Sequence, residues 1–150
     1  MRKDFYTGLF LPKQYMSKEH IVPRSLLRPK HHSDKINIVT TDIVLNSFRS
    51  NYRFAEIPIH VQKYFPLKIS LFTNIGPVDD IIPFYSIDIF DRAQILSAVK
   101  DDRNKLFYPL LFHHQIALIA TKMMIKYPYL DKNDIFDDPL TLRRWIDRYH

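Results

Sequence analysis

The fold is decided by residues 18–51, which read KEHIVPRSLLRPKHHSDKINIVTTDIVLNSFRSN. The β-branched residues that follow His20 stop at Pro23, a pattern typical of a short strand that ends in a loop. A second apolar, β-branched run at residues 36–39 predicts another strand, which pairs with the first one as a hairpin. The intervening loop of residues 24–35 is long and rich in cations.

A helix is predicted immediately after the hairpin. The Thr-Thr-Asp sequence at residues 40–42 offers side-chain oxygens to the unpaired amides of a first helical turn, which places the helix at about residues 43–51. The order strand, strand, helix indicates an α+β fold with its core at about residues 18–54.

The rest of the chain is expected to support this core. Residues 1–16 lack a sustained period and predict an irregular lead-in, and the segment between Phe54 and Pro83 predicts extended or looping chain. About three helices follow, predicted at residues 88–99, 114–127 and 140–149, the last introduced by Asp138 as cap and Pro139 at the first position. No repeat or flexible linker divides the sequence, so residues 1–150 are expected to form a single domain.

The composition excludes several classes of site and partner. The chain has no cysteine, which removes disulfide frameworks, thiolate zinc sites and cysteine nucleophiles. The pairs His31-His32 and His113-His114 are interpreted as surface or core-edge residues, because adjacent histidines seldom bind one metal together. No stretch approaches the roughly 18 apolar residues of a membrane span, so no membrane partner is expected. A secretory signal is not recognisable, and an intracellular location, cytoplasmic or nuclear, is expected.

Positive charge is concentrated in the first third of the chain. Residues 1–54 carry ten Lys or Arg against four Asp or Glu, whereas residues 55–150 carry twelve of each, which together give the formal net charge of +6. A basic face of this kind either meets a polyanion or is ordinary solvated surface, and charge alone leaves both interpretations open.

The residues that point to chemistry are Glu19, His20, Asn37 and Asn46. Histidine has an unperturbed pKa of about 6.5 and takes a proton from water near neutral pH, which makes His20 a candidate general base. The Glu19 carboxylate and the Asn46 amide oxygen are candidate ligands for one hard cation, and such sparse oxygen ligation suits Mg²⁺ or Mn²⁺ better than zinc. Each residue taken singly is more often a turn, capping or surface residue, so the hypothesis depends on their order and spacing.

The segment from Lys18 to Asn51 resembles the core of the HNH nucleases, which are also called ββα-metal or His-Me finger nucleases. His-Ile-Val-Pro at residues 20–23 is common in that group, and LNSFRSNY at residues 45–52 is similar to a segment of the bacterial endonuclease I family. Further matches to that family follow in order at Phe107-Tyr108-Pro109, Ile116-Ala117, Met123-Met124 and Trp145. The chain departs from the family at His114 and Leu118, where Gly and Arg are usual.

The resemblance implies a role for each candidate. Glu19 and Asn46 would be metal ligands, and His20 would activate the attacking water. Asn37 would fix the loop and with it the imidazole. Arg49 lies three residues beyond Asn46, on the same helical face, and is expected to reach a phosphate or the transition-state charge; the alternative is a solvated helix arginine. Contacts to nucleic-acid phosphates are expected from Arg24, Arg28, Lys30, Arg49 and Arg53.

The expected function is metal-dependent hydrolysis of phosphodiester bonds in DNA, with RNA left open as a substrate. Sequence preference should be weak, because no separate recognition element is evident. Two alternatives remain. One is a catalytically silent nucleic-acid-binding or packaging protein on the same scaffold, and the other is an interaction protein whose basic face meets an acidic partner.

Overall fold

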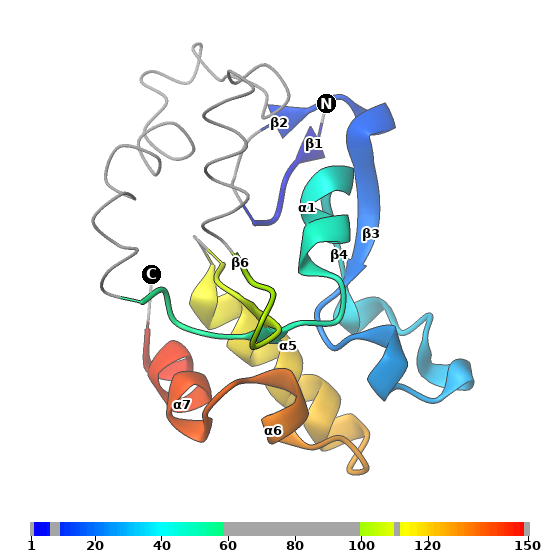
Figure 1. Ribbon diagram of the computed structural model, residues 1–150. Coiled ribbons are helices and arrows are strands. Elements are labelled where there is room, and N and C mark those ends of the chain that lie inside the picture. The colour runs from blue at the N-terminus through cyan, green and yellow to red at the C-terminus, as the bar shows by residue number, and fades with distance from the viewer. Residues whose placement is uncertain (1, 7–9, 59–99, 110–111, 149–150) are drawn as a thin grey trace.

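The computed structural model describes residues 2–6, 10–58, 100–109 and 112–148 (Figure 1). Small sheets and helices share one apolar core, so the α+β class expected from the sequence is confirmed. The helix predicted at residues 88–99 and most of the extended segment predicted at residues 54–83 lie outside the described residues. In the part that is described, no helix has the length and apolar character needed to cross a membrane.

A hairpin and a helix form the part of the fold that carries the candidate site. Strand β3 (Met16–His20) pairs antiparallel with β4 (Ile38–Asp42), with Met16 opposite Asp42 and His20 opposite Ile38. Helix α1 (Ile43–Arg49) follows without a break and packs against both strands. Asp42 caps it as predicted, because its Oδ1 accepts the Leu45 amide at 3.2 Å.

Several boundaries of the hairpin and of α1 differ from the predictions, among them the end of β4, which lies at Asp42 and not at residue 39. Strand β3 ends at His20 rather than at Pro23. Asn37 is not in a strand but ends a 3-10 turn, η4 (Lys35–Asn37), whose first residues are capped by the Asp34 carboxylate. Helix α1 ends at Arg49 rather than at residue 51, because Ser50 takes a left-handed conformation with φ of 50°.

The loop between the two strands is compact and is held against a distant part of the chain. It contains the 3-10 turns η2 (Arg24–Leu26) and η3 (Pro29–His31) before η4. Turn η4 packs on α5 (His113–Lys126), and the loop lies beside the carboxyl end of that helix (Figure 1). The loop is therefore an ordered part of the fold.

The core lies between α1, α5 and the carboxyl-terminal helices. Helix α6 (Lys132–Ile135) was not predicted, and α5 begins one residue earlier than predicted. Helix α7 (Pro139–Asp147) begins as predicted, with Asp138 as its N-cap and Pro139 at the first position. Trp145 is fully buried, and Phe54, Phe107 and Phe136 pack within the same cluster. These aromatic rings hold α7 against the small sheet described next.

The remaining strands close the core and fix the amino terminus. Strand β5 (Arg53–Phe54) runs parallel to β7 (Leu106–Phe107), which pairs antiparallel with β6 (Lys100–Asp101). The lead-in contains β1 (Arg2–Lys3), which pairs with β2 (Phe10–Leu11), followed by the 3-10 turn η1 (Lys13–Tyr15). Buried Asp4 ties this lead-in to β4, because its Oδ1 accepts the Thr41 hydroxyl and the Asp42 amide.

Candidate functional site

The candidate residues meet at a hollow between β3, the loop that follows it and α1. The hollow has a volume of about 540 Å³. Its lining residues are Lys18, Glu19, His20, Pro23, Arg24, Ser25, Asn46, Ser50 and Asn51. Three of the predicted site residues, Glu19, His20 and Asn46, are therefore brought together, and one predicted cation, Arg24, joins them.

His20 stands at the end of β3 with its ring held by the loop. Its Nε2 lies 2.7 Å from the backbone carbonyl oxygen of His32. A carbonyl only accepts hydrogen bonds, so this contact requires a proton on Nε2 and leaves Nδ1 as the basic nitrogen of the neutral ring. The side chain is half-buried. An imidazole fixed in this way has one defined tautomer and one defined orientation.

Asn37 fixes the turn that follows His20. The side chain is fully buried, its Oδ1 accepts the Val22 amide at 2.7 Å, and its Nδ2 donates to the Val22 carbonyl at 2.9 Å. The Asn37 carbonyl in turn accepts the Ile21 amide at 3.0 Å. One asparagine thus satisfies both polar groups of a buried backbone unit, which would otherwise lack partners away from water.

Asn46 approaches the same place from α1. Its amide nitrogen Nδ2 donates to the Ser17 hydroxyl at 2.7 Å and to the Lys18 carbonyl at 3.0 Å. Both bonds use the NH₂ group, so the Oδ1 atom is the acceptor that the side chain offers to a cation. The two donations also fix the direction of the amide plane relative to β3.

Glu19 is more deeply buried than a metal ligand at an open cleft needs to be. The residue is 3% exposed, and its Oε2 accepts the Tyr6 hydroxyl at 2.8 Å and lies 3.4 Å from Arg49 Nη1. Burial raises the pKa of this carboxyl above its usual range, and the Arg49 charge and the Tyr6 hydrogen bond oppose that rise. The carboxylate is therefore already paired, although the residue lines the hollow.

The buried position of Arg49 excludes the phosphate contact that was predicted for it. The side chain is fully buried. Its Nη1 and Nη2 donate to the carbonyls of His20 and Ile21 at 2.7 and 2.8 Å, and Nε donates to the Tyr52 carbonyl at 3.0 Å. The guanidinium also lies over the Phe54 ring, 4.2 Å from its centre. Arg49 is neither a solvated arginine nor free to reach a phosphate, and it instead supports the backbone that carries His20.

Several residues at the hollow were not identified from the sequence. Lys18 shares a face of β3 with His20 because side chains alternate along a strand, and that alternation was the signal for it. Ser25 and the pair Ser50 and Asn51 also line the hollow. Tyr6, the partner of Glu19, lies in a lead-in whose pattern carried no signal.

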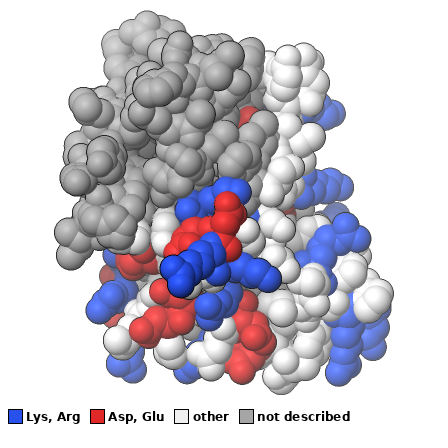
Figure 2. All heavy atoms as spheres, viewed as in Figure 1, with Lys and Arg blue, Asp and Glu red and all other residues white. Residues whose placement is uncertain are grey.

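The predicted basic contacts do not all lie at the hollow. Arg24, Arg28 and Lys30 are exposed on the loop, and the Arg28 guanidinium lies over the Tyr129 ring at 4.6 Å. Arg53 is in β5, with Nη1 3.5 Å from the Asn133 carbonyl, and does not line the hollow. Figure 2 shows Lys and Arg along the edge formed by β3 and its loop, whereas over β6 and α6 Asp and Glu are mixed with further Lys and Arg.

The paired histidines form no metal centre among the described residues. There, no three His, Cys, Asp or Glu side chains come together in a way that could hold an ion. His31 stacks on Tyr127 with ring centres 4.0 Å apart, and the His32 ring bonds the Leu27 carbonyl at 3.0 Å. His113 Nε2 bonds the Pro109 carbonyl at 2.8 Å, and His114 Nδ1 lies 3.2 Å from the Trp145 carbonyl.

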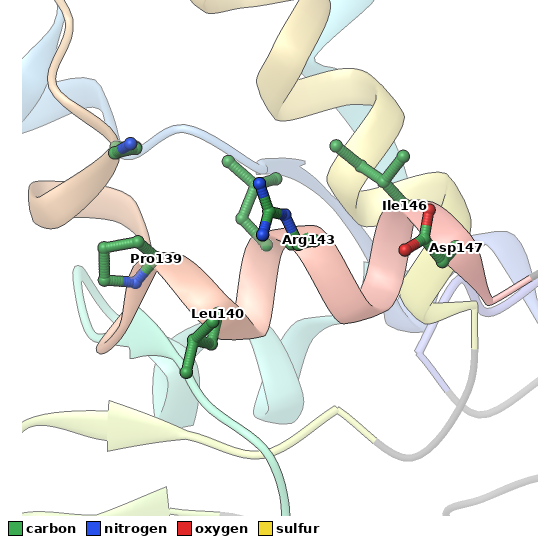
Figure 3. A pocket seen from close by; sticks show the side chains of 7 residues that line it. Pro139, Leu140, Arg143, Ile146 and Asp147 are labelled. Atoms are coloured by element: carbon green, nitrogen blue, oxygen red, sulfur yellow. The ribbon is translucent and has the colours of Figure 1, made fainter.

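A second hollow lies on the carboxyl-terminal helices. It is lined mainly by α7, with Pro139, Leu140, Arg143, Ile146 and Asp147 labelled in Figure 3. Its volume of about 540 Å³ equals that of the first hollow. Its lining offers a single carboxylate and no histidine, so the candidate chemistry belongs to the hollow at His20.

The comparisons with known proteins leave the family of this chain open. No protein-family model matches the sequence, and neither the curated proteins nor the solved structures contain a match to it.

Proposed function

We propose that this protein is a metal-dependent endonuclease of the HNH, or ββα-metal, type that hydrolyses phosphodiester bonds of nucleic acids with little sequence preference. The observation that carries the proposal is the His20 imidazole, held at Nε2 by the His32 carbonyl at the edge of a hollow that Asn46 and Glu19 also line. The order β3, loop, β4, α1 is the order of the finger that the sequence resembles.

The proposed reaction begins with proton transfer to His20. With the proton of the neutral ring on Nε2, Nδ1 takes a proton from a water molecule, whose oxygen then attacks phosphorus. The resulting imidazolium keeps its Nε2 hydrogen bond to His32, so the ring does not need to turn during the reaction. The P–O bond to the leaving 3′ oxygen breaks, that oxygen takes a proton from a water molecule, and His20 returns its proton to the solvent. The family resemblance implies that the new 5′ end carries the phosphate.

The donor groups fit a hard cation with few protein ligands. Asn46 offers its amide oxygen, and Glu19 is among the residues that line the hollow, although Tyr6 and Arg49 already contact its carboxylate. A bound Mg²⁺ or Mn²⁺ ion would stabilise negative charge on the phosphate and the leaving oxygen. Because the ion would take most of its shell from water and substrate, binding by the free protein should be weak.

The basic residues support a nucleic-acid substrate. Lys18 and Arg24 line the hollow, and Arg28 and Lys30 extend the positive surface along the loop. Cations that contact phosphates bind any sequence and release counterions, so affinity would fall steeply with salt. Arg24 replaces Arg49 as the proposed phosphate contact at the hollow, because Arg24 is exposed and lines the hollow.

A cleavage assay tests the proposal directly. The pure chain is incubated with supercoiled plasmid and Mg²⁺, and the expected result is nicked and then linear DNA. His20→Ala should lose cleavage by about 100-fold or more, because a general base contributes at least that factor, and added imidazole should restore part of the rate. Exposed Arg143 provides the control, since Arg143→Ala should cleave normally. Cleavage that survives chelation, or that His20→Ala retains at the normal rate, would overturn the mechanism.

The catalytically silent nucleic-acid-binding protein is the second candidate. It is favoured by the pairing of Glu19 with Arg49, which occupies the carboxylate that a metal would need. Such a protein would shift DNA at low salt with or without metal and never nick it. The same plasmid samples, run on a native gel, distinguish the two candidates.

A further inference from the structure

The loop that orients His20 is anchored by residues about one hundred positions away in the sequence. His32, whose carbonyl accepts from the His20 ring, lies two residues before Asp34. The Asp34 Oδ2 accepts the Tyr127 hydroxyl at 2.6 Å and pairs with Lys126 Nζ at 2.8 Å. Both partners lie at the carboxyl end of α5 (Figure 1).

Asp34 connects this anchor to the site in both directions along the chain. Its Oδ1 accepts the Ile36 amide at 3.0 Å, and its backbone carbonyl accepts the Asn37 amide at 3.1 Å. These bonds place η4, whose last residue Asn37 clamps Val22. The Asp34 amide in turn lies 3.3 Å from the His31 carbonyl, one residue before His32.

The same tyrosine also supports the loop through ring stacking. The centres of the His31 and Tyr127 rings are 4.0 Å apart, and the planes of the two rings meet at an angle of 27°. A neighbouring residue, Tyr129, adds a hydroxyl that bonds the His31 Nδ1 at 2.9 Å and the Arg28 amide at 3.1 Å. Tyr127 thus holds the loop by its hydroxyl and by its ring face, and the two contributions are separable by substitution.

We infer that Tyr127 is a positioning residue for His20, acting through Asp34 on the loop that carries the His32 carbonyl. The inference rests on the proposed function, because it assigns to α5 a part in orienting the proposed general base. The Tyr127 hydroxyl carries this role, because it donates to the Asp34 carboxylate. The Asp34 side chain is only 6% exposed, so water competes little for this hydrogen bond. Tyr127 itself is not among the residues that line the hollow.

Tyr127→Phe tests this role, because it removes the hydroxyl and keeps the ring that stacks on His31. In the plasmid assay kcat should fall about tenfold while KM stays within about twofold, since a misplaced base slows the reaction without removing phosphate contacts. Asp34→Asn should lose at least as much, because it also removes the ion pair with Lys126. The double variant should be no slower than Asp34→Asn within about twofold, because the bond between Tyr127 and Asp34 is already lost in that single variant.

The chain supplies a matched control in Tyr52. Its hydroxyl also bonds an aspartate, Asp102, at 2.6 Å, but that pair is exposed and Asp102 follows β6 instead of lying on the loop. The contact of Tyr52 with Arg49 uses the backbone carbonyl, which the substitution keeps. Tyr52→Phe therefore makes the same chemical change and should leave kcat unaltered. A readout that does not depend on cleavage is the exchange rate of the His20 Nε2 proton, measured by NMR of the ring nitrogens. The bond to His32 should protect this proton in the wild type, and Tyr127→Phe should speed its exchange.

The two proposals fail in different ways. If the wild type cleaves no nucleic acid, the proposed function is lost, and the proton-exchange comparison still decides the inference. If the wild type cleaves and Tyr127→Phe matches it in kcat and in His20 proton exchange, Tyr127 has no positioning role.

Discussion

Replacing Arg49 by Met should destabilise the protein more than any ordinary surface change. The substitution removes the donors to the carbonyls of His20, Ile21 and Tyr52 and leaves the buried Glu19 carboxylate without its counter-charge. Breaking a buried pair from one side costs about 3–5 kcal/mol. For a domain of this size, each kcal/mol corresponds to roughly 2–4 °C, so the melting temperature should fall by about 6–20 °C at pH 7.

The loss should depend on pH in a defined direction. The pKa of Glu19 is raised by burial, and without the Arg49 charge it should rise further. A carboxyl with a higher pKa in the folded chain than in the unfolded chain binds its proton more tightly when folded. Stability is therefore lost as pH rises above the ordinary value of 4.5, and the variant should recover part of its deficit near pH 5.

Thermal and urea unfolding followed by circular dichroism at pH 5 and pH 7 measure both effects. Glu19→Gln combined with Arg49→Met should regain much of the loss at pH 7, because the buried charge is gone. Exposed Arg143 gives the control, and Arg143→Met should change stability by no more than about 0.5 kcal/mol. Equal stability of wild type and Arg49→Met, or a double variant no better than Arg49→Met at pH 7, would refute the reasoning.

Three further predictions concern the loop and the basic surface. Asn37→Ala leaves the buried amide and carbonyl of Val22 without partners and should lower the unfolding free energy by roughly 2–6 kcal/mol, which urea titration measures. The hydrogen bond from Lys126 helps to lower the pKa of Asp34 to about 2. The ionised Asp34 carboxylate therefore stabilises the folded chain fully at pH values above its ordinary pKa of 3.8, and this stabilisation is lost as the pH falls toward 2. In Asp34→Asn the unfolding free energy should therefore fall less between pH 4 and pH 2 than in the wild type. The same fall in both proteins would contradict this role of Asp34. Arg24→Ala should reduce the slope of log K against log salt for DNA binding by about 1, and an unchanged slope would exclude a phosphate contact.

The hairpin, its loop and the start of α1 could be predicted from the sequence because their signals are local. Asp42 indicated the start of a helix in the sequence, and its side-chain oxygen caps α1 in the structure. The β-branched residues before Asp42 lie in strand β4. Asn37 was placed in the strand instead of in η4, because a 3-10 turn of three residues has no period of its own. The short helix α6 was missed for the same reason.

The role of Arg49 could not be predicted, because helical spacing assigns a face and not a depth. Arg49 and Asn46 are three residues apart, yet Asn46 lines the hollow while Arg49 is fully buried. Arg49 is buried because its guanidinium lies over the Phe54 ring and donates to the carbonyls of His20, Ile21 and Tyr52, which belong to other segments. Contacts between distant segments, such as Tyr127 with Asp34 across 93 positions, likewise leave no local pattern.

The backbone around His20 is held by more buried polar side chains than the stability of the fold requires. Arg49 holds the carbonyls of His20 and Ile21, and Asn37 holds the amide of Ile21 and both backbone groups of Val22. A buried charge pair such as Glu19–Arg49 is often no more stabilising than apolar residues of the same volume. Two buried polar side chains therefore fix one three-residue segment at a cost that packing could have avoided. A backbone segment held by several buried hydrogen bonds keeps the side chain that it carries in one orientation, as a catalytic imidazole requires. The arrangement therefore agrees with the catalytic role proposed for His20.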